Sequence, residues 1–238
     1  MSLRESAKAT VKVTLTGPEG KVLKVIEGES PDPFSYTVMN YLQLYLGGTI
    51  PTITMTDPFG NRYVFDLVTP SPITSLGYLT ASICLTRCPN TGSTPPDSTG
   101  IWLFNGVPST GNIYGWTFYS YDAIPSSSLI TGLSYSPPKA YIDFSSPSSP
   151  GDIVYSRTHV TQSITNTLSS PVSVYTIVLA GAVYGSRSTS PVYVPVTFYI
   201  FSPPIVFSPG VTMTVTVTLG YPYGIAISSS SESGGIVV

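Results

Sequence analysis

The chain has 238 residues, of which 42% are hydrophobic and only 9% are charged, and its formal net charge is −2. An average soluble domain carries roughly 25% charged residues, so Ser, Thr, Tyr, Pro and Gly must cover much of this protein's surface. The composition argues against intrinsic disorder, and it favours strands and tight turns over helices. No run of about 18 apolar residues is present, which excludes a helix that spans a membrane.

The first 32 residues stand apart, because they hold ten of the chain's 22 charged residues. Residues 9–27 have the pattern of a hairpin, with apolar and polar residues alternating before a Gly-Pro-Glu-Gly turn. We therefore predict a charged N-terminal arm or hairpin over residues 1–32. Its basic residues are candidate assembly contacts: Arg4, Lys8, Lys12, Lys21 and Lys24. The arm is also the candidate for binding nucleic acid, but five acidic residues lie among the basic ones and favour a solvated, salt-bridged hairpin.

Residues 33–227 are predicted to form the main domain. It begins with a short helix over residues 35–46, followed by a hairpin with strands over residues 50–56 and 62–68. The further expected strands span residues 73–85, 101–104, 114–121, 140–144, 153–166, 172–183, 192–201 and 211–219. About eight strands separated by Gly, Pro and Ser turns predict an all-β protein with an antiparallel β-sandwich, most simply a jelly roll.

The clearest strand is Val211–Leu219, in which every odd position is apolar and every even position is Thr. A period of two residues is typical of a half-buried strand. The strand over residues 192–201 also has apolar residues on its second face, which leaves two alternatives, burial on both sides or a place in an interface. Its candidate assembly contacts are Tyr193, Tyr199 and Phe201.

The aromatic residues around Trp102 and Trp116 pack in the core or in an interface in our preferred interpretation, and stacking on sugars is the alternative. Residues 228–238 are predicted to be a flexible C-terminal tail. Its apolar end, residues 236–238, could instead add a strand to the sheet of a neighbouring subunit.

Catalytic and metal-binding groups are sparse in this sequence. The one histidine, His159, lies within a predicted strand, and the carboxylates beyond residue 32 are scattered singly, so no acid–base pair can be proposed. Cys84 and Cys88 lack the spacing and the partners of a zinc site. They form either a local disulfide or two free thiols, because a bridge requires the chain to turn between them. We therefore expect no catalytic site, no metal ion and no cofactor.

Several turn and strand motifs follow one another in a familiar order. They are a short helix over residues 36–46, the strand end Thr-Asp-Pro-Phe-Gly-Asn at 56–61, the loop Pro-Asn-Thr-Gly-Ser-Thr-Pro-Pro at 89–96, Thr-Asn-Thr at 165–167, and Ser-Pro-Gly at 208–210 before the Val/Thr strand. This order, over most of residues 33–220, resembles virion proteins of archaeal viruses and some phages, and the charge-poor style is similar to that of particles from hot, acidic habitats. The resemblance implies a jelly-roll-like capsid, turret, spike or tail component of a hyperthermophilic archaeal virus, without catalytic residues.

The sequence thus combines an exterior type of composition with an N-terminus that lacks the apolar segment of a signal peptide. It also contains no Asn-x-Ser/Thr sequon for glycosylation. Both features are expected of a virion protein that assembles in the host cytoplasm and is later exposed outside the cell. Its expected partners are copies of itself, other virion proteins and the host surface. The alternative is a secreted cell-surface fibre subunit or adhesin, joined by strand donation from one of its termini.

Overall fold

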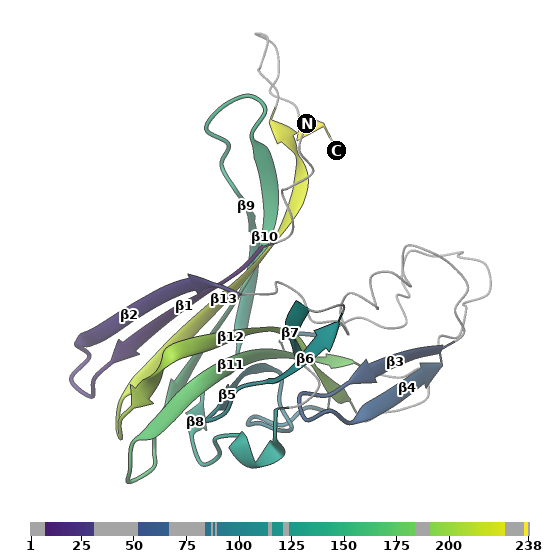
Figure 1. Cartoon of the computed structure of the whole chain (residues 1–238). Coiled ribbons are helices and arrows are strands. Elements are labelled where there is room, and N and C mark those ends of the chain that lie inside the picture. Colours follow the sequence, from purple (N-terminus) through teal and green to yellow (C-terminus); the bar gives the residue numbers. More distant parts are fainter. Residues whose placement is uncertain are drawn as a thin grey trace.

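The computed structural model describes residues 8–30, 52–66, 84–86, 88, 90–113, 116–120, 124–183, 191–226 and 236–237. Within these ranges the chain is an antiparallel β-sandwich, as predicted (Figure 1). The predicted helix over residues 35–46 and most of the strand predicted over residues 73–85 lie outside the described residues. The jelly-roll topology stays a prediction.

The larger sheet has the strand order β2-β1-β13-β10-β8. In addition, β9 pairs with β10, and β14 pairs with β13. Its strands are β1 (Lys8–Thr16), β2 (Val22–Glu29), β8 (Ser134–Tyr135), β9 (Lys139–Phe144), β10 (Ile153–Thr165), β13 (Thr212–Ala226) and β14 (Ile236–Val237). Strand β1 lies inside the sheet, between β2 and β13. The hairpin predicted from the N-terminal pattern is therefore present, but it belongs to the sandwich, whereas the charges had suggested a separate arm.

The smaller sheet has the order β12-β11-β5. Its strands are β5 (Gly100–Phe104), β11 (Val172–Val183) and β12 (Val192–Phe207). Two hairpins stand beside the sheets, one of β3 (Thr52–Thr56) and β4 (Arg62–Asp66), the other of β6 (Ser109–Ile113) and β7 (Trp116–Ser120), and a short 3₁₀ turn spans Ser126–Ser128. Figure 1 shows the two larger sheets as layers that face each other.

The main core fills the space between these layers. The odd-numbered apolar residues of β1 and β13 point into it, as the alternating sequence predicts, and Val13 and Val215 are completely buried. Residues of all three strands of the smaller sheet meet them from the other side, among them Leu103, Leu179 and Phe207. Apolar burial between two sheets is the main stabilising contribution to this kind of fold.

The smaller sheet is buried on its second face as well. Trp102, Phe104 and Phe198 form a separate apolar cluster there, and Phe59 of the turn between β3 and β4 packs against it. Burial on both faces explains why β5 and much of β11 are apolar at nearly every position. Because only 1% of Trp102 is exposed, this residue cannot stack on a sugar at the surface.

The outer face of the larger sheet carries a row of hydroxyl pairs between β10 and β13. Cross-strand hydrogen bonds of 2.9–3.0 Å join Thr161 to Thr216, Ser163 to Thr214 and Thr165 to Thr212. These pairs follow from the register of β10 and β13, which places residues of the same face directly opposite one another. The all-Thr face of the Val/Thr strand is thus satisfied within the sheet.

Candidate functional site

One end of the larger sheet extends beyond the body of the sandwich (Figure 1). We call this extension the projecting arm; it consists of residues 139–159, with β9 and the first half of β10, together with residues 218–226 at the end of β13. The pairing of β9 with β10 and of β10 with β13 continues through it. Strand β14 pairs with β13 at Ile225 and Ala226, so residues 236–237 are paired within their own chain.

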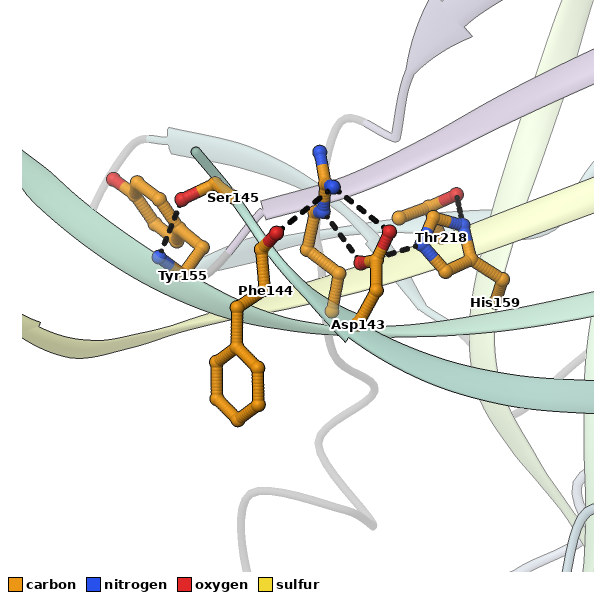
Figure 2. Close-up of polar contacts among 7 residues, drawn as sticks. Asp143, Phe144, Ser145, Tyr155, His159 and Thr218 are labelled. Carbon is orange, nitrogen blue, oxygen red and sulfur yellow. Dashed lines mark hydrogen bonds and ion pairs between the residues drawn. The ribbon is translucent and has the colours of Figure 1, made fainter. Parts of the chain in front are cut away.

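A polar cluster lies where the arm joins the body (Figure 2). The guanidinium of Arg157 donates two hydrogen bonds of 2.8 Å to the two carboxylate oxygens of Asp143, which lies directly opposite on β9. The Nε2 atom of His159 is 3.0 Å from the same carboxylate, and its Nδ1 atom is 2.9 Å from the hydroxyl of Thr218 on β13. The cluster therefore joins all three strands of the arm at its base.

The charges of this cluster stabilise the ionised form of Asp143. Hydrogen bonds from Arg157, and then from His159, lower the pKa of the Asp143 carboxyl below its usual value. If His159 is neutral, Nε2–H donates to the carboxylate and Nδ1 accepts from the Thr218 hydroxyl. The ring of Tyr141 stacks on the imidazole at a centroid distance of 4.4 Å and covers one face of it.

A hydroxyl, an imidazole and a carboxylate in a row are also the elements of an activated nucleophile. Here, however, the Asp143 carboxylate is held by Arg157 as well as by His159. Thr218 lies on a strand paired on both sides, opposite Thr10 of β1 and His159 of β10, so its neighbouring backbone N–H groups are in the sheet. The arrangement can orient the strands, but the backbone N–H groups next to Thr218 are used in the sheet and cannot stabilise a reacting oxyanion.

The arm exposes apolar side chains that the body does not cover. On β9, Ala140 lies opposite Val160, which belongs to the main core, so Ile142 and Phe144 lie on the continuation of the core face. Ile142 is nevertheless 66% exposed and Phe144 51% exposed. The ring of Phe144 contacts that of Tyr223 at 5.0 Å, and Tyr223 is exposed too. Ile142, Phe144 and Tyr223 are called the arm patch below.

Sequence reasoning identified the strand that carries this patch but not the patch itself. A strand of residues 140–144 with mixed apolar residues has the same pattern whether its apolar face is covered or exposed. The signal that could have pointed to it is the pair of turn-rich segments that flank the strand, residues 136–138 and 145–151, which place it at the end of a long hairpin.

The predicted basic contacts are spread over the molecule. Lys8 lies at the base of the arm, with its Nζ atom 5.6 Å from the centre of the Tyr155 ring. Lys12 forms an ion pair of 2.6 Å with Glu27 across the β1–β2 hairpin. Lys21 and Lys24 are exposed at the far end of that hairpin, and Arg4 lies outside the described residues. The structure therefore does not bring the four described basic residues together as one surface.

The aromatic residues predicted as contacts are used within the chain. Phe201, a predicted assembly contact, is only 5% exposed and belongs to the main core of its own chain. Tyr199 packs edge-on against Phe201, with ring centres 4.9 Å apart. Tyr193 lies 5.9 Å from the Trp102 ring, and its hydroxyl donates to the Asp97 carbonyl. Tyr199 and Phe201 thus lie on the main-core side of β12, and Tyr193 lies on the side of the Trp102 cluster, so β12 is covered on both faces, one of the two alternatives.

The two cysteines form a disulfide. The Cα atoms of Cys84 and Cys88 are 5.9 Å apart, so the chain turns between them, as a bridge requires. The backbone of Cys84 pairs with that of Ala182 on β11 through hydrogen bonds of 2.9 and 2.8 Å. The bridge thus lies at the edge of the sandwich and far along the chain from the arm.

Comparison with known proteins gives no relative for this chain, since no protein family, curated protein or solved structure matches it. The likeness to virion proteins of archaeal viruses therefore stays a prediction. Among the described residues, no group of three or more His, Cys, Asp and Glu side chains could hold a metal ion. The same residues include no helix long and apolar enough to cross a membrane.

Proposed function

We propose that this chain is a structural subunit that acts by association, not by catalysis, and that it is a component of a virus particle, as a capsid, penton or turret, spike or tail protein. The observation that carries the proposal is the arm patch, whose apolar side chains stay exposed on two strands, β9 and β13, that extend beyond the body of the sandwich. Contiguous exposed apolar side chains mark interaction surfaces. In an assembly, the neighbouring subunits would cover them.

The chemistry of the surface supports an exterior setting for that assembly. The hydroxyl pairs of the outer sheet face do not change their charge between acid and neutral pH, unlike carboxylate pairs. Disulfides persist in oxidising surroundings and in proteins of hyperthermophiles, and this chain has one. The resemblance of the order of turn and strand motifs to virion proteins is the support for proposing a virus particle as the assembly.

The association is tested by sedimentation velocity over a wide range of protein concentrations. We expect the wild-type chain to form larger species as its concentration rises and Ile142→Lys to remain monomeric, because a charge in the arm patch is desolvated on association. Val206→Lys is the matched control, since Val206 is 61% exposed on β12, away from the arm. A wild-type chain that stays monomeric throughout, or equal loss of association in both variants, would refute the proposal.

Whether the chain is a component of a virus particle is tested separately. Mass spectrometry of particles purified from a culture that carries the gene should find this chain in a fixed ratio to the other particle proteins. Its absence from such particles would refute the assignment to a virion, while leaving the self-association intact.

A second candidate is a cell-surface fibre subunit or adhesin, and the free edge of the larger sheet favours it. Among the described residues, β2 is an edge strand of the larger sheet, and its residues Val22, Leu23 and Val25 are exposed. A strand donated by a neighbouring subunit could therefore pair with β2. Fractionation of expressing cells separates the two candidates. A fibre subunit would be found on the cell surface without any particle.

A further inference from the structure

The outer edge of β9 is open to pairing with another strand. Among the described residues β9 pairs only with β10. Just beyond its end, the Ser145 N–H donates to the Tyr155 carbonyl, which continues the register of the two strands. In an antiparallel pair, the backbone N–H and C=O groups of successive residues point alternately toward and away from the partner strand. The backbone groups of the odd-numbered residues of β9 therefore point toward β10. The N–H and C=O groups of Ala140 and Ile142 therefore point outward, along the open edge.

The charges along this edge are complementary to themselves. Lys139 stands at one end of β9 and Asp143 near the other, two residues on either side of Tyr141. If two β9 strands pair antiparallel with Tyr141 opposite its own copy, each Lys139 lies directly opposite Asp143 of the other copy. Opposite charges across a strand pair are stabilising, whereas a parallel arrangement in register would place like charges side by side. An ionised carboxylate has room for further donors beyond Arg157 and His159.

The same pairing also extends the apolar face. Ala140 of each copy then lies opposite Ile142 of the other, and these residues exchange the outward-pointing backbone groups. The two arm patches become one strip on a continuous sheet, shared by both copies. Because the two copies are related by a two-fold axis, the contact between Ala140 of one copy and Ile142 of the other occurs twice. Such repeated contacts are usual in the interface of a symmetric dimer.

The β2 edge of the larger sheet is less suited to this role. Its pairing with β1 has a register shift between Lys24 and Val22, with Leu23 as the extra residue. Such a bulge interrupts the regular row of backbone groups and discourages pairing along an edge.

We propose that two copies of this chain join through their projecting arms, by antiparallel pairing of the open β9 edges about a two-fold axis at Tyr141. This inference rests on the proposed function and specifies its contact. A pair of six-residue strands is a small interface, below the area of a stable complex by itself. It is therefore an arm-to-arm link that works together with other contacts of an assembly.

The test is a cysteine at the axis. The chain's two native cysteines are joined to each other, so Tyr141→Cys introduces one free thiol, which would lie about 4.5 Å in Cα distance from its copy. Under mild oxidation we expect a dimer linked through residue 141, formed about tenfold or more faster than the dimer of the β2-edge control Val25→Cys, because the paired strands raise the effective thiol concentration. Peptide mapping identifies the linkage, and Tyr141→Ser serves as the folding control.

The charge arrangement is tested in the same assay. Adding Lys139→Glu to Tyr141→Cys should slow the cross-link at low salt, since the introduced carboxylate would face Asp143 of the other copy, and high salt should restore part of the rate. Sedimentation of the same samples separates the possible failures. Association without a 141–141 link, or a faster link at residue 25, would overturn the arm pairing alone; a chain that remains monomeric would overturn the proposed function as well.

Discussion

Gln162 is a buried amide that joins the two sheets, and its replacement by Glu gives a sharp test of the sandwich. Only 2% of the residue is exposed. Its side-chain oxygen accepts from the Ile101 N–H of β5 at 2.6 Å, and its nitrogen donates to the Ser136 carbonyl at 2.8 Å. An ionised Glu keeps the first bond but brings a second negative oxygen against the Ser136 carbonyl. We therefore expect the pKa of the introduced carboxyl to rise strongly, as it does for other buried carboxyls.

The magnitude follows from that pKa. If the folded pKa reaches about 7, somewhat under three units above the usual value, the variant loses about 3 kcal/mol at pH 7 and about 4 kcal/mol at higher pH. Because the folded pKa is raised, the loss of unfolding free energy is absent below about pH 4. It then grows by about 1.4 kcal/mol per pH unit as the pH rises to the folded pKa. Near pH 4 the protonated acid can donate to the Ser136 carbonyl as the amide does, so stability should return close to that of the wild type.

The measurement is the free energy of unfolding in urea between pH 4 and pH 8, taken as the difference between wild type and variant so that the other titrating groups cancel. Thr161→Glu is the matched control, because it puts the same charge on the outer face of the same strand. It should change stability by less than about 1 kcal/mol at any pH. An equal stability difference for Gln162→Glu at both ends of the pH range would refute the buried, bridging position of Gln162.

Three further predictions concern the arm, a close contact and the disulfide. Hydrogen bonds from Arg157 lower the pKa of Asp143, so the contribution of this cluster to the free energy of unfolding should persist above about pH 4 and be lost only as pH falls through the lowered pKa. A carboxyl NMR titration should place the titration midpoint of Asp143 below that of a model Asp. A midpoint above that of a model Asp would contradict the geometry. Gly28→Ala should cost about 1–3 kcal/mol, because its methyl would overlap the Tyr199 ring, and a double-mutant cycle with Tyr199→Leu should recover most of the loss; additive effects would argue against the contact. Replacing both cysteines by serine should lower the unfolding free energy by about 2 kcal/mol, as expected for so short a closed loop, and calorimetry would detect an unchanged melting temperature if the bridge were absent.

Much of the candidate site could not be read from the sequence, and the polar cluster shows why. His159 was identified as a residue within a strand, and the structure places it there. Its partners Asp143 and Thr218 lie 16 and 59 residues away along the chain, in strands that also occur in the sequence prediction. Their meeting depends on the register between distant strands, which residue pattern alone does not fix.

The same limit applies to the predicted contacts. Phe201 has the same residue type and strand pattern as a surface aromatic in an interface, but the larger sheet covers it. Ile142 has the pattern of a core residue, but no layer of the described chain lies over it. Alternation indicates which residues share a face of a strand, and the arrangement of the two sheets decides how far along the strand that face is covered.

The sequence by itself determined that the chain is built of antiparallel strands, because local alternation and turn residues act over a few neighbours. The Val/Thr strand is the clearest case, since its period of two already separates a core face from a hydroxyl face. Only the tertiary structure decided that the charged hairpin joins the sandwich and that β9, β10 and β13 extend beyond it as an arm. These features depend on which distant strands pair and where their covering layer ends, and no short stretch of residues contains that information.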